Sequence, residues 1–167
     1  MLKFARTLLA GSLVVVFSAS AFALDKPTGR PILTVSGLIS EKNTSNDAQF
    51  DAAMLDKLPQ QKMKVETPWY KTAQTFEGPL FRDVLKATGS KGKKLYVVAL
   101  NDYAAEIPLS DLEKHDVILA RKINGKVISV RDKGPLFIIY PFDKKPELRT
   151  KDIYSRCVWL VNRIRVE

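Results

Sequence analysis

A short loop with two aromatic rings and a lysine is the part of this sequence best suited to binding chemistry. Trp69, Tyr70 and Lys71 follow Pro68 directly, and a proline restricts its neighbours to extended or turn conformations, which predicts a loop. Aromatic rings stack on planar groups, and a lysine ammonium is a compact positive charge for anions. We therefore expect this loop to bind a small anionic or planar ligand. The alternative is that the rings cover the core while Lys71 is solvated.

The other chemistry-bearing residues show no catalytic or metal-binding pattern. Cys157 is the only cysteine and His115 the only histidine, so no Cys/His cluster can hold a structural metal, and no intrachain disulfide can form. His115 is expected in a turn between a short helix and a strand. Cys157 begins the apolar run of a strand over 157–166 and is expected in the core. We expect no catalytic residue and no metal site.

Short strands and helices must hold the aromatic loop in place. The first half predicts strands over 31–40 and 63–66. Asn46 and Gln49 form a capping box before an apolar stripe at helical spacing, and Pro59 ends that helix. A second helix is expected between Pro79 and Gly89.

The second half is β-rich, with strands expected over 95–100, 103–107, 117–123, 126–130, 136–140 and 157–166. Asn124-Gly125 accepts positive φ at both positions and predicts a hairpin. The last strand is apolar on both faces at its start, which is typical of a central strand. The sequence thus predicts an α+β fold, a single compact domain with mixed or antiparallel sheets and two or three short helices.

The first 23 residues have the pattern of a cleavable signal peptide. Lys3 and Arg6 precede the apolar stretch 8–17, and small residues lead up to Ala23. The stretch is too short to span a bilayer, which needs about 20 residues, although an uncleaved anchor helix is the alternative. The basic residues are not a twin-arginine pair, which indicates the general secretory route. We expect a periplasmic protein with no stable membrane anchor after cleavage.

The remaining chain reads as one unit. Residues 24–30 contain Pro27 and Gly29 and are expected to be a loose leader, and residues 31–167 have the length of one domain. The chain has a formal net charge of +9, which favours anionic partners or simply keeps the protein soluble. No basic run is interleaved with aromatic residues, so a nucleic-acid partner is not expected.

The second half also carries a series of short motifs in a distinctive order. They are Phe76-Glu77-Gly78-Pro79-Leu80, Val97 to Leu100 followed by Asn101-Asp102-Tyr103, Ile107-Pro108-Leu109, Asn124-Gly125, Gly134-Pro135-Leu136, Tyr140-Pro141 and Val158 to Ile164. In this order they resemble the molybdopterin-binding oxidoreductase domain of sulfite oxidase and plant-type nitrate reductase. The resemblance implies the sulfite oxidase-type fold for residues 31–167.

The resemblance also implies a molybdenum site from which this sequence departs. The family supplies a cysteine thiolate, a soft ligand suited to the metal, from the loop before Phe76. Here Thr67 lies about where that ligand would be, and threonine cannot form a thiolate. Phe137 stands where the family usually has an arginine, and Asp102 replaces a glycine that lets backbone approach a ligand.

The family geometry would place further residues beside the aromatic loop, from the turn after residue 100 and from the segment 131–133. The candidate pocket is therefore Thr67, Trp69, Tyr70, Lys71, Asn101, Asp102, Tyr103, Arg131 and Lys133.

Two functions compete on these observations. One is a cofactor-free module that binds a small ligand or an envelope protein, with an accessory or sensory role. The other is a molybdopterin-dependent oxidoreductase with atypical metal ligation, and a purely structural envelope protein is a third reading. A chain exported unfolded cannot carry a prebound pterin, so the leader and the absent cysteine both favour the binding module.

Overall fold

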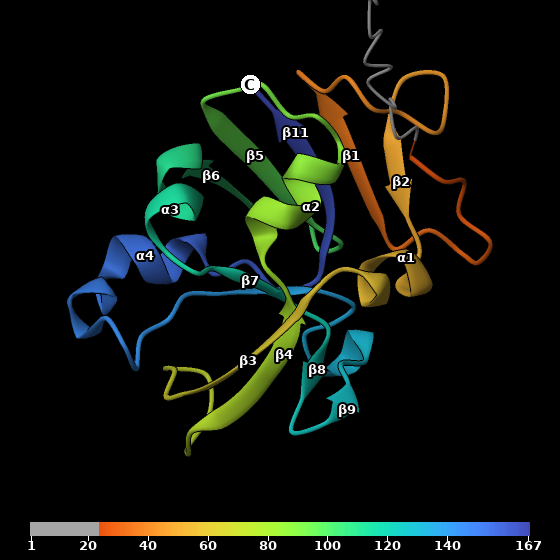
Figure 1. Ribbon diagram of the computed structural model, residues 1–167. Helices are drawn as coiled ribbons and strands as arrows, with labels where there is room; N and C mark the ends of the chain where they lie inside the picture. Colours follow the sequence, from red (N-terminus) through yellow and green to blue (C-terminus); the bar gives the residue numbers. More distant parts are fainter. Residues whose placement is uncertain (1–23) are drawn as a thin grey trace, which may run out of the picture.

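The largest element of the protein is a five-stranded sheet of order β2-β1-β11-β5-β6 (Figure 1). The computed structural model describes residues 24–167, so the predicted signal peptide at 1–23 lies outside the described residues. β1 and β11 run parallel, and the other neighbours are antiparallel. The strands are β1 (Leu33–Gly37), β2 (Ala48–Phe50), β5 (Lys94–Ala99), β6 (Ala104–Pro108) and β11 (Val161–Val166). The predicted central position of the last strand is confirmed.

Two smaller sheets hold the aromatic loop. One has the order β3-β4-β8-β9 and the other pairs β10 with β7. The strands are β3 (Gln60–Val65), β4 (Gln74–Pro79), β7 (Ile118–Ala120), β8 (Lys122–Ile123), β9 (Lys126–Val127) and β10 (Phe137–Ile139). β3 and β4 pair from Gln60↔Pro79 to Val65↔Gln74, so the loop 66–73 closes a regular hairpin. Asn124 and Gly125 have φ of 50° and 79°, which confirms the predicted β8–β9 hairpin.

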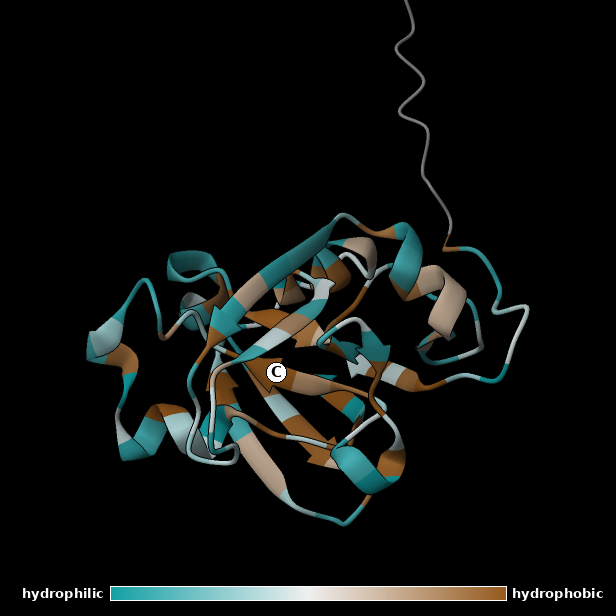
Figure 2. Cartoon of the chain, turned by 90° about the horizontal axis from the view of Figure 1, so that it is seen from below, coloured by the Kyte–Doolittle hydropathy of each residue, from teal (hydrophilic) through white to brown (hydrophobic). Residues whose placement is uncertain are grey.

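Four short α-helices pack around these sheets in the described residues. They are α1 (Ala52–Lys57), α2 (Phe81–Ala87), α3 (Leu109–Lys114) and α4 (Lys151–Arg156), with 3-10 helices η1 (Val130–Asp132) and η2 (Pro146–Leu148). α2 and α3 lie across one face of the five-stranded sheet (Figure 1), and the hydrophobic residues gather on the inner strands (Figure 2). The α+β class and the single compact domain are confirmed. Within residues 24–167, none of the helices has the length and apolar character needed to span a bilayer.

The first helix begins after Asp51, so the predicted capping box of Asn46 and Gln49 is wrong. Asp51 Oδ1 accepts a hydrogen bond from Met54 N at 2.8 Å, which caps the helix. Gln49 lies in β2, opposite Thr34 of β1. β2 is a strand because its first and last side chains are buried beside β1, a contact between distant segments that local helical spacing cannot reveal.

The segment before the second helix is a strand, not merely a lead into it. Residues Gln74–Pro79 form β4, whose Phe76 is fully buried. Gly78 is required there, because a Cβ at this position would collide with the carbonyl oxygen of Leu119 in β7. β4 therefore packs closely against β7 and fixes one end of the aromatic loop.

The last strand begins later than the predicted range 157–166. Residues 151–156 form α4, Cys157 ends that helix, and β11 begins at Val161. Cys157 is buried as expected but does not belong to the strand. Leu160 has a φ of 58°, a left-handed conformation that is uncommon outside glycine. Its N–H donates to Lys133 O at 3.0 Å and its carbonyl accepts from Leu100 N at 2.9 Å, so this strained turn directs the chain from α4 into the sheet.

Candidate functional site

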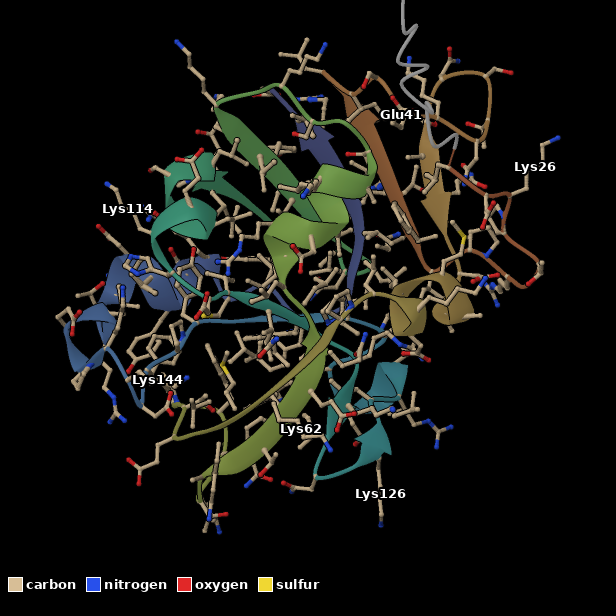
Figure 3. The ribbon with its side chains drawn as sticks, in the orientation of Figure 1. Lys26, Glu41, Lys62, Lys114, Lys126 and Lys144 are labelled. Carbon is tan, nitrogen blue, oxygen red and sulfur yellow. The ribbon has the colours of Figure 1, made fainter. Side chains whose placement is uncertain are left out.

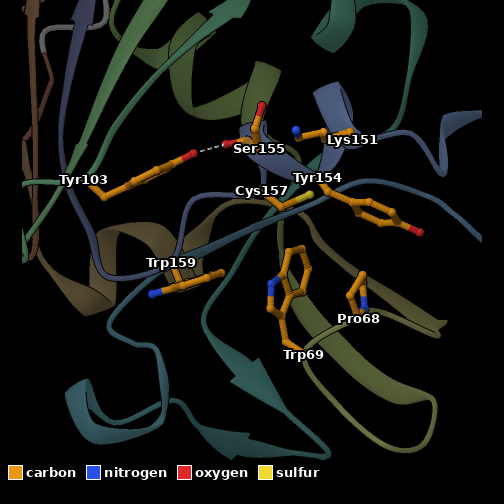
Figure 4. Close-up of a pocket in the computed structure, with 8 residues that line it drawn as sticks. All are labelled: Pro68, Trp69, Tyr103, Lys151, Tyr154, Ser155, Cys157 and Trp159. Carbon is orange, nitrogen blue, oxygen red and sulfur yellow. Dashed lines mark hydrogen bonds between the residues drawn. The ribbon is translucent and has the colours of Figure 1, made fainter.

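A cavity of about 570 Å³ lies between the aromatic loop and α4 (Figure 4). Its lining comes from the loop after β3, the turn between β5 and β6, α4, and the segment leading into β11. The lining residues are Pro68, Trp69, Tyr103, Lys151, Tyr154, Ser155, Cys157 and Trp159. Two of the predicted pocket residues, Trp69 and Tyr103, therefore meet in one cavity although they lie far apart in the sequence.

Trp69 forms the floor of the cavity and packs onto the core at the same time. Its ring lies 5.3 Å from the ring of Phe137, 6.0 Å from Tyr154 and 5.6 Å from Trp159, measured between centroids. The last two contacts are edge-to-face, an arrangement that aromatic pairs prefer. Trp69 thus covers the core, as one of the two expectations had it, and also lines the cavity, while ligand binding by this ring stays a prediction.

α4 forms the opposite wall and is held by side-chain hydrogen bonds at both ends. Thr150 caps its start by accepting from Ile153 N at 3.3 Å. Asp111 Oδ2 in α3 accepts from Arg156 Nη1 at 2.8 Å and from the hydroxyl of Tyr140 at 2.8 Å. Burial and then the nearby carboxylate raise the pKa of the Tyr140 phenol, so this hydroxyl is a donor at any physiological pH.

Tyr103 and Lys151 lie at the rim of the cavity. Tyr103 is 47% exposed, and its hydroxyl donates to the carbonyl of Ser155 at 2.9 Å, which ties the β5–β6 turn to α4 (Figure 4). Lys151 stands in the first turn of α4 and is exposed. Within residues 24–167 it forms no salt bridge, so its ammonium is the charge available to a ligand at this rim.

Cys157 lines the cavity, but its thiol is in an environment that makes it unreactive. The side chain is 2% exposed, and Sγ donates to the carbonyl of Ile153 at 3.4 Å. Burial raises the pKa of the thiol, and a cysteine acts as nucleophile or metal ligand only as thiolate. Its environment is that of a structural residue.

The structure separates the remaining predicted residues from the cavity. Tyr70 packs against Phe76, and the ammonium of Lys133 lies 5.1 Å from the centre of the Tyr70 ring, a cation–π contact. Thr67 is buried, and its Oγ1 has no hydrogen-bond partner among the described residues. Four further residues of the predicted pocket are exposed and do not line this cavity. They are Lys71, Asn101, Asp102 and Arg131.

Several lining residues were not predicted because they belong to α4 and the turn after it. They are Lys151, Tyr154, Ser155, Cys157 and Trp159. A signal for the helix is present in the sequence: Thr150 is a good N-cap, and Ile153 and Cys157 are four residues apart on one face. The neighbouring lysine-rich composition favoured a loop over 141–152 instead.

Neither Thr67 nor Cys157 matches the needs of a molybdenum cofactor, which takes a thiolate ligand in this family. Thr67, where the family resemblance would place the metal ligand, is a buried side chain with a hard oxygen donor, and burial raises the pKa of the Cys157 thiol so that it stays protonated. No group of three or more His, Cys, Asp or Glu side chains within residues 24–167 could hold a metal ion. Lys151 is the one cationic side chain that lines the cavity. A single positive charge is a weak binding site for the phosphate of a pterin.

Comparisons with known proteins agree with this architecture. No curated protein sequence matches the chain. Among solved structures, the sulfane dehydrogenase SoxCD from Paracoccus pantotrophus superposes with a TM-score of 0.60 at 18% identity, over 80% of this chain and 37% of that chain. The chain thus spans little more than a third of that protein's chain, and the likeness concerns the fold. The sequence profile of the oxidoreductase molybdopterin binding domain matches residues 28–142. The protein is therefore a member of the oxidoreductase molybdopterin binding domain family and has the sulfite oxidase-type fold.

Proposed function

We propose that this protein is an exported, cofactor-free binding module that takes a small planar organic anion into the cavity between the aromatic loop and α4. The observation that carries the proposal is the composition of the cavity lining. Both tryptophans of the chain, two tyrosines and a lysine that forms no salt bridge within residues 24–167 line the same space.

The chemistry of the lining supports a planar, partly apolar ligand. Indole and phenol rings present large flat surfaces at a low cost in conformational entropy. The volume of about 570 Å³ lies in the range of small-molecule sites, which is roughly 300–1,000 Å³. Lys151 at the rim adds attraction for an anionic group, and this attraction weakens as salt rises.

The cofactor-free state and the location are parts of the same proposal. Thr67 in place of a thiolate and the protonated Cys157 support a site that works without molybdenum. The leader at 1–23 supports export to the periplasm in an unfolded state. A module of this kind would act beside other envelope proteins as an accessory or sensory component, with its ligand as the signal.

Intrinsic fluorescence offers a direct test, because Trp69 and Trp159 are the only tryptophans of the chain and both line the cavity. The probe is 2-naphthoate, a planar aromatic carboxylate, and 2-naphthylmethanol is its neutral counterpart. We expect naphthoate to change the tryptophan emission saturably. Lys151→Gln should weaken naphthoate binding about three- to fivefold, as expected for an exposed ion pair, and should leave the neutral probe unaffected.

Lys71→Gln is the matched control, because Lys71 is also an exposed lysine near Trp69 but does not line the cavity. This variant should bind naphthoate like the unmodified protein. Absence of saturable emission change, or equal weakening by Lys71→Gln and Lys151→Gln, would contradict the proposed site.

A further inference from the structure

A second hollow of about 390 Å³ lies beside paired residues of β1 and β11, Thr34 and Arg163. It is bordered by the segment before β1, the start of β11, the end of β5, η1 and the loop before β10. The lining residues are Arg30, Pro31, Ile32, Thr34, Leu100, Val130, Pro135, Asn162 and Arg163. None of them lines the cavity of the aromatic loop, so the two spaces are distinct.

Strand register explains why an arginine stands at this place. Thr34 of β1 pairs with Arg163 of β11. Side chains alternate between the faces of a strand, so these two point away from the buried face that carries Val35 and Ile164. The Arg163 side chain is 60% exposed, and its ion-pair partner is Asp102 at 4.0 Å, whose side chain is 92% exposed. Such a long, solvated pair leaves the guanidinium available.

The charged side chains that line the hollow are both arginines, Arg30 and Arg163. Arg30 forms no salt bridge within the described residues 24–167, and no acidic residue lines the space. Asn162 Oδ1 is buried without a hydrogen-bond partner there, which leaves Nδ2 as the polar side-chain atom that can face the hollow. Two guanidinium groups and an amide N–H therefore border one space without an acid, and guanidinium groups suit carboxylates through paired hydrogen bonds.

The rest of the lining is apolar and unusually accessible. Leu100 is 48% exposed and Val130 is 58% exposed. Together with Pro31 and Pro135, Leu100 and Val130 form an apolar border beside the two arginines. Exposed apolar side chains are ordinary when scattered, but a group of them at one concave, cationic place indicates a binding site.

We propose that this hollow binds an amphiphilic monocarboxylate. Its head group lies between Arg30 and Arg163, and its apolar body lies along Leu100 and Val130. Charge complementarity selects the head group, because the lining supplies cations and no acid. The apolar border selects a hydrocarbon body over a free inorganic anion.

The test uses octanoate as the probe, with octanol as the neutral counterpart and acetate as the head group alone. Methyl signals of Leu100 and Val130 are followed by NMR in the full chain. We expect octanoate to shift them saturably, and octanol and acetate to bind at least about fivefold more weakly. Arg163→Gln should weaken octanoate binding by a similar factor.

Arg165→Gln is the matched control. Arg165 is two residues further along the same strand and face, lies over the Tyr96 ring at 5.1 Å, and donates from Nε to Glu167 Oε1 at 2.7 Å. It does not line the hollow, so this variant should keep the octanoate affinity. The inference would be overturned by equal weakening in the two variants, by equal affinity for octanol, or by shifts confined to the indole N–H signals of Trp69 and Trp159.

Discussion

Asp51 is the residue that makes the most hydrogen bonds between the folded domain and the leader, where Asn43 Nδ2 also donates to the carbonyl of Asp25 at 2.7 Å. Its Oδ1 accepts from Met54 N at 2.8 Å, and its Oδ2 accepts from Thr28 N at 2.8 Å and Gly29 N at 2.7 Å. The bond from Gly29 is the largest cause of a lowered pKa at this carboxyl, followed by that from Met54. The segment 24–30 has no regular secondary structure, yet this carboxylate fixes its backbone.

Stability should therefore depend on the ionisation of Asp51. A carboxyl whose folded pKa is lowered stabilises the protein above its unfolded pKa, here 3.8, and loses this contribution as pH falls through the folded value. Asp51→Ala should melt several degrees lower than the unmodified protein at pH 7, and the difference should shrink below pH 4. Thermal melts of both proteins over pH 2.5–7 measure this, and a difference that stays constant across that range would refute it.

Trp69 is both a cavity wall and a core-packing residue. Trp69→Leu should lower the free energy of unfolding by about 2–3 kcal/mol, because large-to-small changes at packed aromatic sites cost this much or more. Tyr103→Leu should cost less than about 1.5 kcal/mol, because that ring is half exposed and gives up one hydrogen bond. Denaturant unfolding of the two variants compares them, and equal costs would show that Trp69 is only a surface residue.

At the scale of the element, α4 depends on Asp111 more than on its own six residues. A helix this short is not stable by itself. Asp111 accepts hydrogen bonds from Arg156 in α4 and from the buried Tyr140 beside β10, so one carboxylate connects α3, α4 and the core. The wall of the cavity is thus positioned from outside the helix.

Removing the Asp111 carboxylate should destabilise α4 more than it destabilises the five-stranded sheet. Asp111→Ala leaves two largely buried donors without a partner, which should cost about 2–4 kcal/mol. Hydrogen exchange should show a greater loss of protection in α4 than in β11. Asp143→Ala is the control, because Asp143 is exposed and its side chain has no hydrogen-bond partner in the part of the chain described. Uniform loss of protection over both elements would contradict the local role of Asp111.

The elements that could be predicted from sequence are those with a local signature. The β-branched run of β1, the apolar run of β5 and the Asn124-Gly125 turn each determine their own conformation. β2 and β4 could not be predicted this way, because their strand state depends on partners elsewhere: Ala48 lies opposite Val35 in β1, and Gly78 lies against the backbone of β7.

The site could be predicted only in part for the same reason. The aromatic loop has a local signal and reaches the cavity through Trp69, and the family resemblance brought in Tyr103. Local reasoning also could not predict which lysine lines the cavity: Lys71 is two residues from Trp69 in sequence but does not line it, whereas Lys151 of α4 does. The positive φ of Leu160, next to Trp159, has no sequence signal, since leucine rarely adopts it.

At the scale of the whole molecule, β11 and the turn before it contribute to two separate hollows. Trp159 lines the cavity beside α4, whereas Asn162 and Arg163, three and four residues later, line the hollow beside β1 and β11. The positive charge is not gathered at either place, since the labelled lysines extend from several sides of the molecule (Figure 3). We therefore propose that the net charge of +9 attracts anions in general and that selectivity depends on the local donors.

The central claim is that a member of a molybdopterin-binding family works here as a binding module without the cofactor. Metal and pterin analysis of the protein purified from its native compartment tests this most directly. We predict molybdenum and pterin at trace level only, in protein whose tryptophan emission still responds to 2-naphthoate. Molybdenum and pterin in stoichiometric amounts would contradict this claim and would indicate a molybdopterin-dependent oxidoreductase.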